Sequence, residues 1–186
     1  MDAAVQTYRF SVEEFNKLGE VGIFDEDDRV ELLDGEIIVM SPIGRAHAGI
    51  VLRLNTVLNQ RLHTRALVNP ANPAVLDEYS EPLPDFTLLK PKADFYKSGH
   101  PRPEDILLLI EVSDTTLAYD RGRKLRKYAE REVREVWIVN VKDLVIEQFR
   151  VPAGQTYSSS RVFRRGEQIT MEAFPDVVFE VSELIG

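Results

Sequence analysis

The sequence predicts a mixed α/β fold in which helices pack on a central β-sheet. Residues 44–63 repeat apolar side chains at helical spacing, and residues 120–130 form a second predicted helix. The aliphatic run 106–112 and the run 136–140 have the composition of buried strands. The predicted order is helix, hairpin, helix, strands, helix, strands, which differs from the regular alternation of a βαβ protein.

Length and composition indicate one ordinary globular unit. The chain has 186 residues, about the length of a single domain, so we expect one domain over residues 1–186. Hydrophobic residues make up 44% of the chain and charged residues 29%, a balance that permits a buried core. There is no cysteine, which excludes disulfides and thiolate metal sites and agrees with a cytoplasmic location.

The sequence gives no sign of a membrane segment. The first fifteen residues lack the continuous apolar run that a signal peptide or an anchor needs. The longest aliphatic run, residues 106–110, is far shorter than the ~18 residues of a membrane span. We therefore expect a soluble protein with no membrane partner. The net charge of −8 does not by itself indicate nucleic acid, so a polyanion would have to meet a local basic patch or metal ions.

Local signals predict the remaining elements. The capping-box pattern Ser11-Val-Glu-Glu14 predicts a short helix that ends near Gly19. Asp34-Gly35 supplies the positive φ angles of a tight turn, so residues 29–40 are predicted to form an N-terminal hairpin. The proline-rich stretch 67–89 is expected to be extended, with strands near Val75 and across 85–89. Further strands are predicted over 144–150, paired with 136–140, and around Val162, Ile169 and Val178.

Three acidic residues lie in or beside apolar strands: Glu31, Asp85 and Glu111. An ionised carboxylate in such a place costs several kcal/mol unless it is paired or binds a cation. Each also has a purely structural explanation. Glu111 can pair with an arginine, Glu31 can pair with a charge near the turn, and Asp85 can begin a strand or make an Asx turn.

The predicted helix 120–130 places Asp120, Lys124 and Tyr128 on one stripe. An exposed Asp120–Lys124 pair would explain the stripe without any function. The alternative depends on the order of elements, because a helix that returns after the strand 106–112 can carry Lys124 back over the end of that strand.

Other kinds of site find little support. There is no glycine-rich or Gly-Lys-Ser/Thr phosphate loop, and the three histidines lack the paired spacing of a zinc site. His47 lies at the start of the first long helix. It is expected either to be a helix-face residue that supports the site residues, or to contact substrate.

Six short motifs run through the chain from about Tyr8 to Phe179. They are Val30–Glu36, Ser41-Pro42 followed by His47, Leu83-Pro-Asp85, Leu109-Ile-Glu-Val-Ser113, Tyr119-Asp120 with Lys124 and Tyr128, and Val133–Val139. Each motif is weak alone, but all six in this order are fairly specific. Through them the chain resembles the Uma-type endonuclease family, of the restriction-endonuclease-like PD-(D/E)xK nuclease superfamily. The resemblance implies a restriction-endonuclease-like mixed central sheet flanked by helices.

The resemblance also implies a metal site and a catalytic set. Asp85, Glu111 and the carbonyl of Val112 would bind Mg²⁺ or Mn²⁺, and Glu31 would complete the shell or hold a second ion. Ser113 stands where the superfamily signature has its lysine. Lys124 on the following helix matches the displaced lysine, so the implied catalytic residues are Asp85, Glu111 and Lys124. Three groups are expected to support them: His47, Asp120 and Tyr128.

The function implied is metal-dependent hydrolysis of DNA phosphodiester bonds by an endonuclease. Cations of the second helix are expected to receive the phosphate backbone: Arg121, Arg123 and Lys127. A homodimer would suit double-strand cutting, because that needs two sites. The alternative is a catalytically inactive module that keeps the nuclease fold and has a binding or regulatory role, which the acidic net charge and Ser113 favour.

Overall fold

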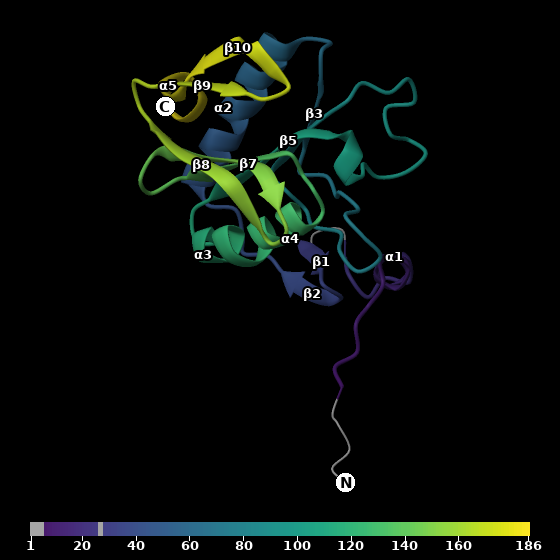
Figure 1. Ribbon diagram of the computed structural model, residues 1–186. Helices are drawn as coiled ribbons and strands as arrows, with labels where there is room; N and C mark the ends of the chain where they lie inside the picture. Colours follow the sequence, from purple (N-terminus) through teal and green to yellow (C-terminus); the bar gives the residue numbers. More distant parts are fainter. Residues whose placement is uncertain (1–5, 26–27) are drawn as a thin grey trace.

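A six-stranded mixed sheet forms the centre of the protein. The computed structural model describes residues 6–25 and 28–186. The sheet has the order β3-β4-β5-β6-β7-β8, and only β5 and β6 run parallel. Its strands are β3 (Leu67–Pro70), β4 (Phe86–Leu89), β5 (Ile106–Ser113), β6 (Glu135–Asn140), β7 (Val145–Ala153) and β8 (Thr156–Arg164). The predicted fold class, a central sheet flanked by helices, is confirmed (Figure 1).

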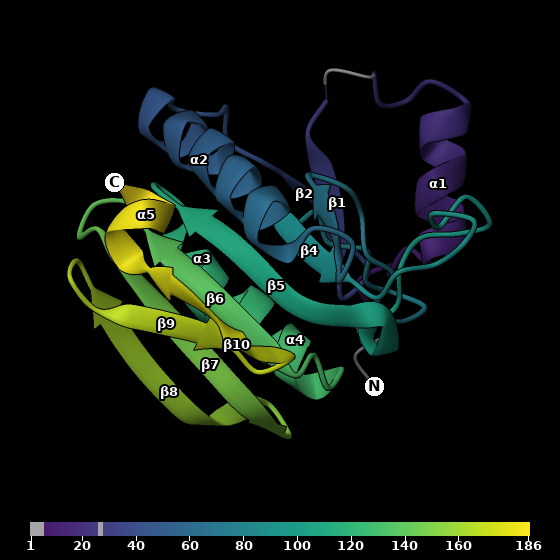
Figure 2. The ribbon, with the colours of Figure 1, turned by 90° about the horizontal axis from the view of Figure 1, so that it is seen from above.

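One face of the sheet carries the larger core. Helix α2 (Arg45–Leu62) crosses it, and helix α5 (Val181–Ile185) lies nearby with the hairpin of β9 (Gln168–Met171) and β10 (Phe174–Glu180) (Figure 2). Leu54 and Leu58 of α2 are fully buried here, and the ring of Trp137 meets that of Phe179 edge to face. The amphipathic pattern of residues 44–63 predicted α2, and the structure confirms it.

The opposite face is covered by one composite helix. It consists of α3 (Leu117–Tyr119), a π turn η2 (Asp120–Lys124) and α4 (Leu125–Glu130). Tyr128 and Ala129 of α4 pack with Leu109 of β5 and Val136 of β6 in a second core cluster. This helix is the crossover that a parallel β5–β6 pair requires. The prediction of a helix over 120–130 is correct, and the π turn is an addition to it.

The N-terminal part forms a small subassembly beside the sheet. Helix α1 (Val12–Glu20) has the predicted capping box between Ser11 and Glu14. Strands β1 (Val30–Leu33) and β2 (Glu36–Val39) form the predicted hairpin, with positive φ at both Asp34 and Gly35. Leu32 exchanges backbone hydrogen bonds with Glu81, which ties the hairpin to the segment before β4.

The prediction for residues 67–89 is partly wrong. No strand contains Val75, whose amide instead donates to the carbonyl of Pro101. The predicted strand across 85–89 is confirmed as β4, and a further strand, β3, ends in Pro70 at the edge of the sheet, where a missing amide donor costs little. A short 3₁₀ helix, η1 (Pro103–Asp105), leads into β5. In the described part of the chain, no helix is both long and apolar enough to cross a membrane.

Candidate active site

Asp85 lies directly before β4, and Glu111 lies on the neighbouring strand β5. Phe86 of β4 pairs with Ile110 of antiparallel β5, so the next position along each segment brings Asp85 beside Glu111. The amide of Val112 donates to Asp85 Oδ2 at 2.7 Å. The structure therefore brings together the two acids that the sequence selected.

Lys124 joins Glu111 to the N-terminal hairpin. Its ammonium lies 2.8 Å from Glu111 Oε1 and 3.1 Å from Glu31 Oε2, and its side chain is 1% exposed. Glu31 also accepts from the amide of Leu83, at 3.0 Å, and from the hydroxyl of Tyr119, at 3.1 Å. The lysine is not an outward-facing helix charge but a buried bridge between three elements.

The three supporting residues lie around this bridge. The hydroxyl of Tyr128 donates to Glu111 Oε1, and His47 Nε2 is 2.9 Å from Asp85 Oδ1. Asp120 Oδ2 accepts from Ser113 Oγ at 2.7 Å and from Thr116 Oγ1 at 2.6 Å. Ser113, at the position of the signature's lysine, is thus a hydrogen-bond donor to the helix.

The π turn explains how the helix presents these groups. Asp120 and Lys124 begin and end it, and both are buried, whereas Arg121 and Gly122 between them are exposed. A π turn is rare and is found mostly at functional sites. Tyr119 and Thr116 were not selected from the sequence as site residues, although Tyr119 stands in one of the six motifs.

The two acids line a small cleft of about 110 Å³. Glu111 and Val112 lie at its β5 side, Asp85 and His47 also line it, and Asp120 borders it from the composite helix. Buried His47 Nδ1 has no hydrogen-bond partner within residues 6–25 and 28–186. The cleft is therefore lined by polar groups, and one buried nitrogen of His47 has no partner among the described residues.

Acidic groups outnumber cations at this cleft. Burial raises the pKa of Glu111 to about 8, with smaller contributions from Asp120, Asp85 and Glu31 and against the opposing effect of Lys124. Burial also raises the pKa of Asp120. For Lys124, burial acts to lower the pKa, but Glu111, Glu31 and Asp120 outweigh it, and the pKa lies well above its usual value. The lysine stays protonated, and the surplus of carboxyl groups favours a further cation.

The donor set partly fits a hard divalent cation. Within the described residues, no three His, Asp or Glu side chains converge on one ion position. Asp85 and Glu111 still offer carboxylate oxygens to the same cleft, with the backbone of Val112 between them. Two carboxylates suffice for Mg²⁺, which usually keeps waters and takes other oxygens from its substrate. Both Glu111 contacts, from Tyr128 and Lys124, fall on Oε1, which leaves Oε2 free of them.

The geometry does not support the expectation that Glu31 completes a metal shell. Its Oε2 meets Lys124 and the Leu83 amide, and its Oε1 accepts from Tyr119. The physical reason is that a buried ammonium needs more than one carboxylate, and Glu31 is the second one.

The basic side chains expected to contact DNA are all paired within the chain. Arg121 forms an ion pair with Glu147, Arg123 with Glu36, and Lys127 with Asp34, Asp77 and Glu130. Their exposed side-chain fractions are 45%, 26% and 7% respectively. A substrate-binding role for them stays a prediction, and for Lys127 the structure indicates a structural one.

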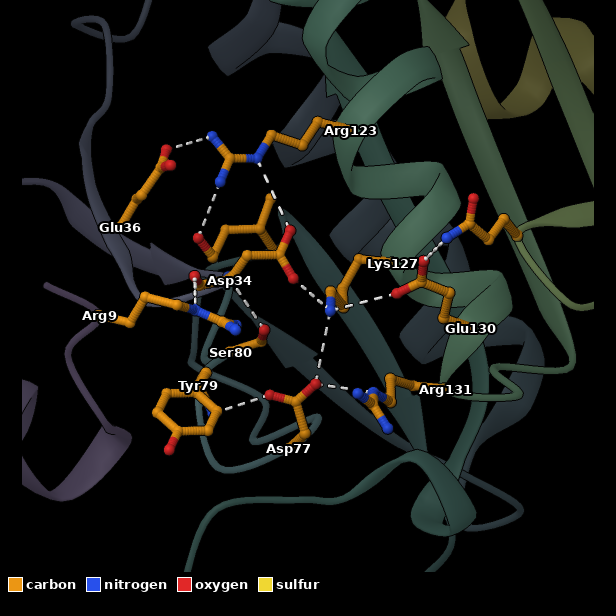
Figure 3. Close-up of polar contacts among 12 residues, drawn as sticks. Arg9, Asp34, Glu36, Asp77, Tyr79, Ser80, Arg123, Lys127, Glu130 and Arg131 are labelled. Carbon is orange, nitrogen blue, oxygen red and sulfur yellow. Dashed lines mark hydrogen bonds and ion pairs between the residues drawn. The ribbon is translucent and has the colours of Figure 1, made fainter. Parts of the chain in front are cut away.

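Arg123 and Lys127 hold the hairpin turn on the composite helix (Figure 3). Asp34 in the turn lies next to both side chains, and Arg123 also donates to the carbonyl of Leu33. Arg131, one helical turn later, pairs with Asp77, which also lies near Lys127. These cations form a second stripe, which fixes the hairpin that carries Glu31. The first stripe is that of Asp120, Lys124 and Tyr128, and it contacts Glu31 through Lys124.

Comparison with known proteins identifies the family and the fold. A model of the family described as "Uma2: Putative restriction endonuclease" matches residues 12–182. The chain belongs to this family. A crystal structure of a nuclease, described as putative and belonging to DUF820, from Anabaena variabilis aligns with a TM-score of 0.70 and 14% identity. The alignment covers 95% of this chain and 97% of that one, which shows a shared fold. A comparison with curated proteins finds no match.

The contacts between the hairpin and the composite helix predict that two neighbouring substitutions lower the free energy of unfolding by different amounts. Lys127→Ala should lower the free energy of unfolding by about 1–3 kcal/mol, because it leaves carboxylates without their cation. Arg126→Ala, at an exposed position of α4, should change it by less than about 0.5 kcal/mol. Urea unfolding followed by tryptophan fluorescence measures the free energy of unfolding of both variants. Equal values for the two variants would contradict the role of Lys127 in holding the hairpin on the composite helix.

The raised pKa of Glu111 predicts a titration near neutral pH in metal-free protein. NMR of the glutamate side-chain carboxyl carbons should show one group titrating near pH 8, absent from Glu111→Gln. Since the folded pKa exceeds the unfolded value of 4.5, the stabilising contribution is complete below about pH 4.5 and is lost as the pH rises toward 8. The unfolding free energy of wild type, minus that of Glu111→Gln, should fall over that range. A Glu111 signal that titrates near pH 4.5 would sink this account.

Proposed function

We propose that this protein is a Mg²⁺- or Mn²⁺-dependent endonuclease that hydrolyses DNA phosphodiester bonds, with Asp85, Glu111 and Lys124 as its catalytic residues. One observation carries the proposal. A carboxyl group on β5 and another directly before β4 line one cleft, and a buried ammonium lies 2.8 Å from the first of them. Membership of the family and the nuclease fold of the aligned structure support the same reading.

Asp85, Glu111 and the carbonyl of Val112 would hold the cation. When bound, it would polarise the phosphodiester and lower the pKa of a coordinated water. Tyr128 and Lys124 fix Glu111 through Oε1, so its other oxygen can ligate without loss of these contacts. His47 contacts Asp85 Oδ1 and the Val112 amide donates to Oδ2, so these two contacts fix the orientation of the Asp85 carboxylate.

Lys124 supplies a fixed positive charge next to the cleft. Its ammonium pairs with Glu111, which lines the cleft and would be a ligand of the cation. From there it can offset the negative charge that the phosphate gains in the transition state. Ser113 occupies the strand position at which the superfamily signature has its lysine. Lys124 lies on the composite helix instead and would supply the same positive charge from there.

Because the protein is acidic overall, DNA must approach it where basic side chains can contact the phosphates. Arg29 lines the cleft, and within residues 6–25 and 28–186 its side chain donates to the carbonyl of Ser41 and forms no ion pair, so we propose it as a phosphate contact there. Arg121 is the most exposed of the three paired helix cations and is the next candidate. A second copy of the chain would supply the second site for double-strand cutting.

The displaced lysine yields the sharpest activity prediction. Lys124→Ala should reduce metal-dependent cleavage of plasmid DNA by on the order of 10²-fold or more, the usual effect of removing a group that stabilises developing charge. Glu111→Gln should abolish Mg²⁺-supported cleavage, because a neutral amide is a poor ligand for a hard dication. Arg126→Ala, exposed on the same helix, is the control and should cleave nearly as well as wild type.

The assay uses plasmid and single-stranded substrates with Mg²⁺, Mn²⁺ or EDTA. Circular dichroism and thermal unfolding of each variant separate loss of chemistry from loss of fold. Cleavage by Lys124→Ala at the wild-type rate would disprove the role of this lysine. A folded wild-type protein that binds Mn²⁺ and cuts neither substrate would instead identify the chain as a catalytically inactive nuclease-fold module.

A further inference from the structure

A second cavity runs along the edge strand β3, separate from the active cleft. Its volume is about 490 Å³. Its walls come from the end of α2, from β3, from the end of β4 and from the loop of residues 91–101. The polar and aromatic lining includes Asn59, His63, Asn69, Asn72, Phe95 and His100. We call this cavity the β3 groove.

The lining of the β3 groove carries hydrogen-bonding groups but no acidic residue, lysine or arginine. Amides, imidazoles and an aromatic ring are the groups that contact nucleobases. A phosphate site would need cations or converging amide donors, and a metal site would need carboxylates. The chemistry of the groove thus complements that of the active cleft, which is rich in charge.

The ring of Phe95 is presented by an ordered loop. Its residue is 73% exposed. Asp94 accepts hydrogen bonds from the amide and hydroxyl of Ser98 and from the amide of Tyr96, and the hydroxyl of Tyr96 donates to the carbonyl of Lys90 at 2.9 Å. These contacts hold the backbone on both sides of Phe95, so a large apolar ring is fixed in solvent beside the groove.

Backbone strain is concentrated at the same place. Eight non-glycine residues in the described part of the chain have positive φ, and three of them line this groove. They are His63 (φ 48°), Phe95 (φ 51°) and Tyr96 (φ 61°). Such conformations are unfavourable for bulky side chains and cluster at sites that clamp ligands. This observation is independent of the chemistry of the lining.

The groove begins close to the active cleft. The amide of Ala71 donates to the carbonyl of Asp85 at 3.0 Å, and Ala71 lies between the two groove residues Asn69 and Asn72. The side-chain amide of Asn72 is held by the carbonyl of Pro70 and by Asn69 Oδ1. The end of the groove at Asn69 and Asn72 is therefore adjacent to the backbone of Asp85, whose side chain lines the active cleft.

We propose that the β3 groove binds an unstacked nucleobase of the strand that lies in the active cleft, with its ring stacked on Phe95. The inference rests on the proposed nuclease function and adds a base-binding site to it. The neutral amides and imidazoles contact the edges of the base, whereas the phosphates stay with the cleft.

The test measures binding without cleavage. Fluorescence anisotropy with a labelled single-stranded oligonucleotide in EDTA should show that Phe95→Ala binds about 5- to 100-fold more weakly than wild type, the effect of losing one base–aromatic stack. Phe95→Trp should bind like wild type. Val21→Ala, which removes a side chain of equal exposure (72%) far away in the sequence, is the matched control and should bind normally.

A second probe isolates base recognition from backbone contact. Wild type should bind the oligonucleotide more tightly than an abasic strand of the same length, and Phe95→Ala should bind the two equally. Equal affinity of wild type for both strands would overturn the groove proposal, even if the protein cleaves DNA. Base-dependent binding that requires Phe95, in a protein that cuts nothing with Mn²⁺, would keep the groove and overturn the catalytic proposal.

Discussion

The buried ammonium of Lys124 is the constraint on which the rest of the site depends. An ion without solvent costs several kcal/mol, and it must recover this from close carboxylates. Glu111 and Glu31 provide them at 2.8 and 3.1 Å, from a central strand and from the hairpin. Glu31 and Glu111 are themselves 1% and 3% exposed, so loss of the lysine leaves two buried acids without their cation, and loss of either acid leaves the buried ammonium with one partner.

This dependence explains the architecture around the lysine. The helix must present Lys124 inward and still meet the hairpin, and the π turn together with the stripe of Arg123 and Lys127 achieves both. The hairpin is outside the central sheet, and ion pairs to its turn at Asp34 fix it there. Lys127, which the sequence suggests as a DNA contact, is one of the residues that bring Glu31 to the site.

Local signals in the sequence predicted most of the elements, and the order of the six motifs selected the acids and the lysine of the candidate site. The apolar period of α2, the Asp-Gly turn and the aliphatic run of β5 each depend on neighbours in the chain. The pairing of Lys124 with Glu111 followed from the order strand, then returning helix. By contrast, the partners of Glu31 and Lys127 are distant in sequence, and no local pattern encodes them. The edge strand β3 was missed because its four residues end in proline.

The β3 groove also could not be predicted from local patterns in the sequence. Its lining comes from four separated segments, and the strained residues His63, Phe95 and Tyr96 carry no marker in the sequence. The sequence did identify the charged cleft, because carboxylates in apolar strands are anomalous by themselves. Neutral amides and aromatic rings are not anomalous, and their function becomes visible only when the fold gathers them.

The central claim is that Asp85 and Glu111 hold one divalent cation beside a paired Lys124. Crystals of the full chain soaked in Mn²⁺ test it most directly, by anomalous diffraction above the manganese edge. The account predicts a peak within coordination distance of Asp85 and Glu111, lost in Glu111→Gln, with Lys124 still paired to Glu31. Mn²⁺ bound only elsewhere, or a cleft that stays empty at saturating Mn²⁺, would contradict the account.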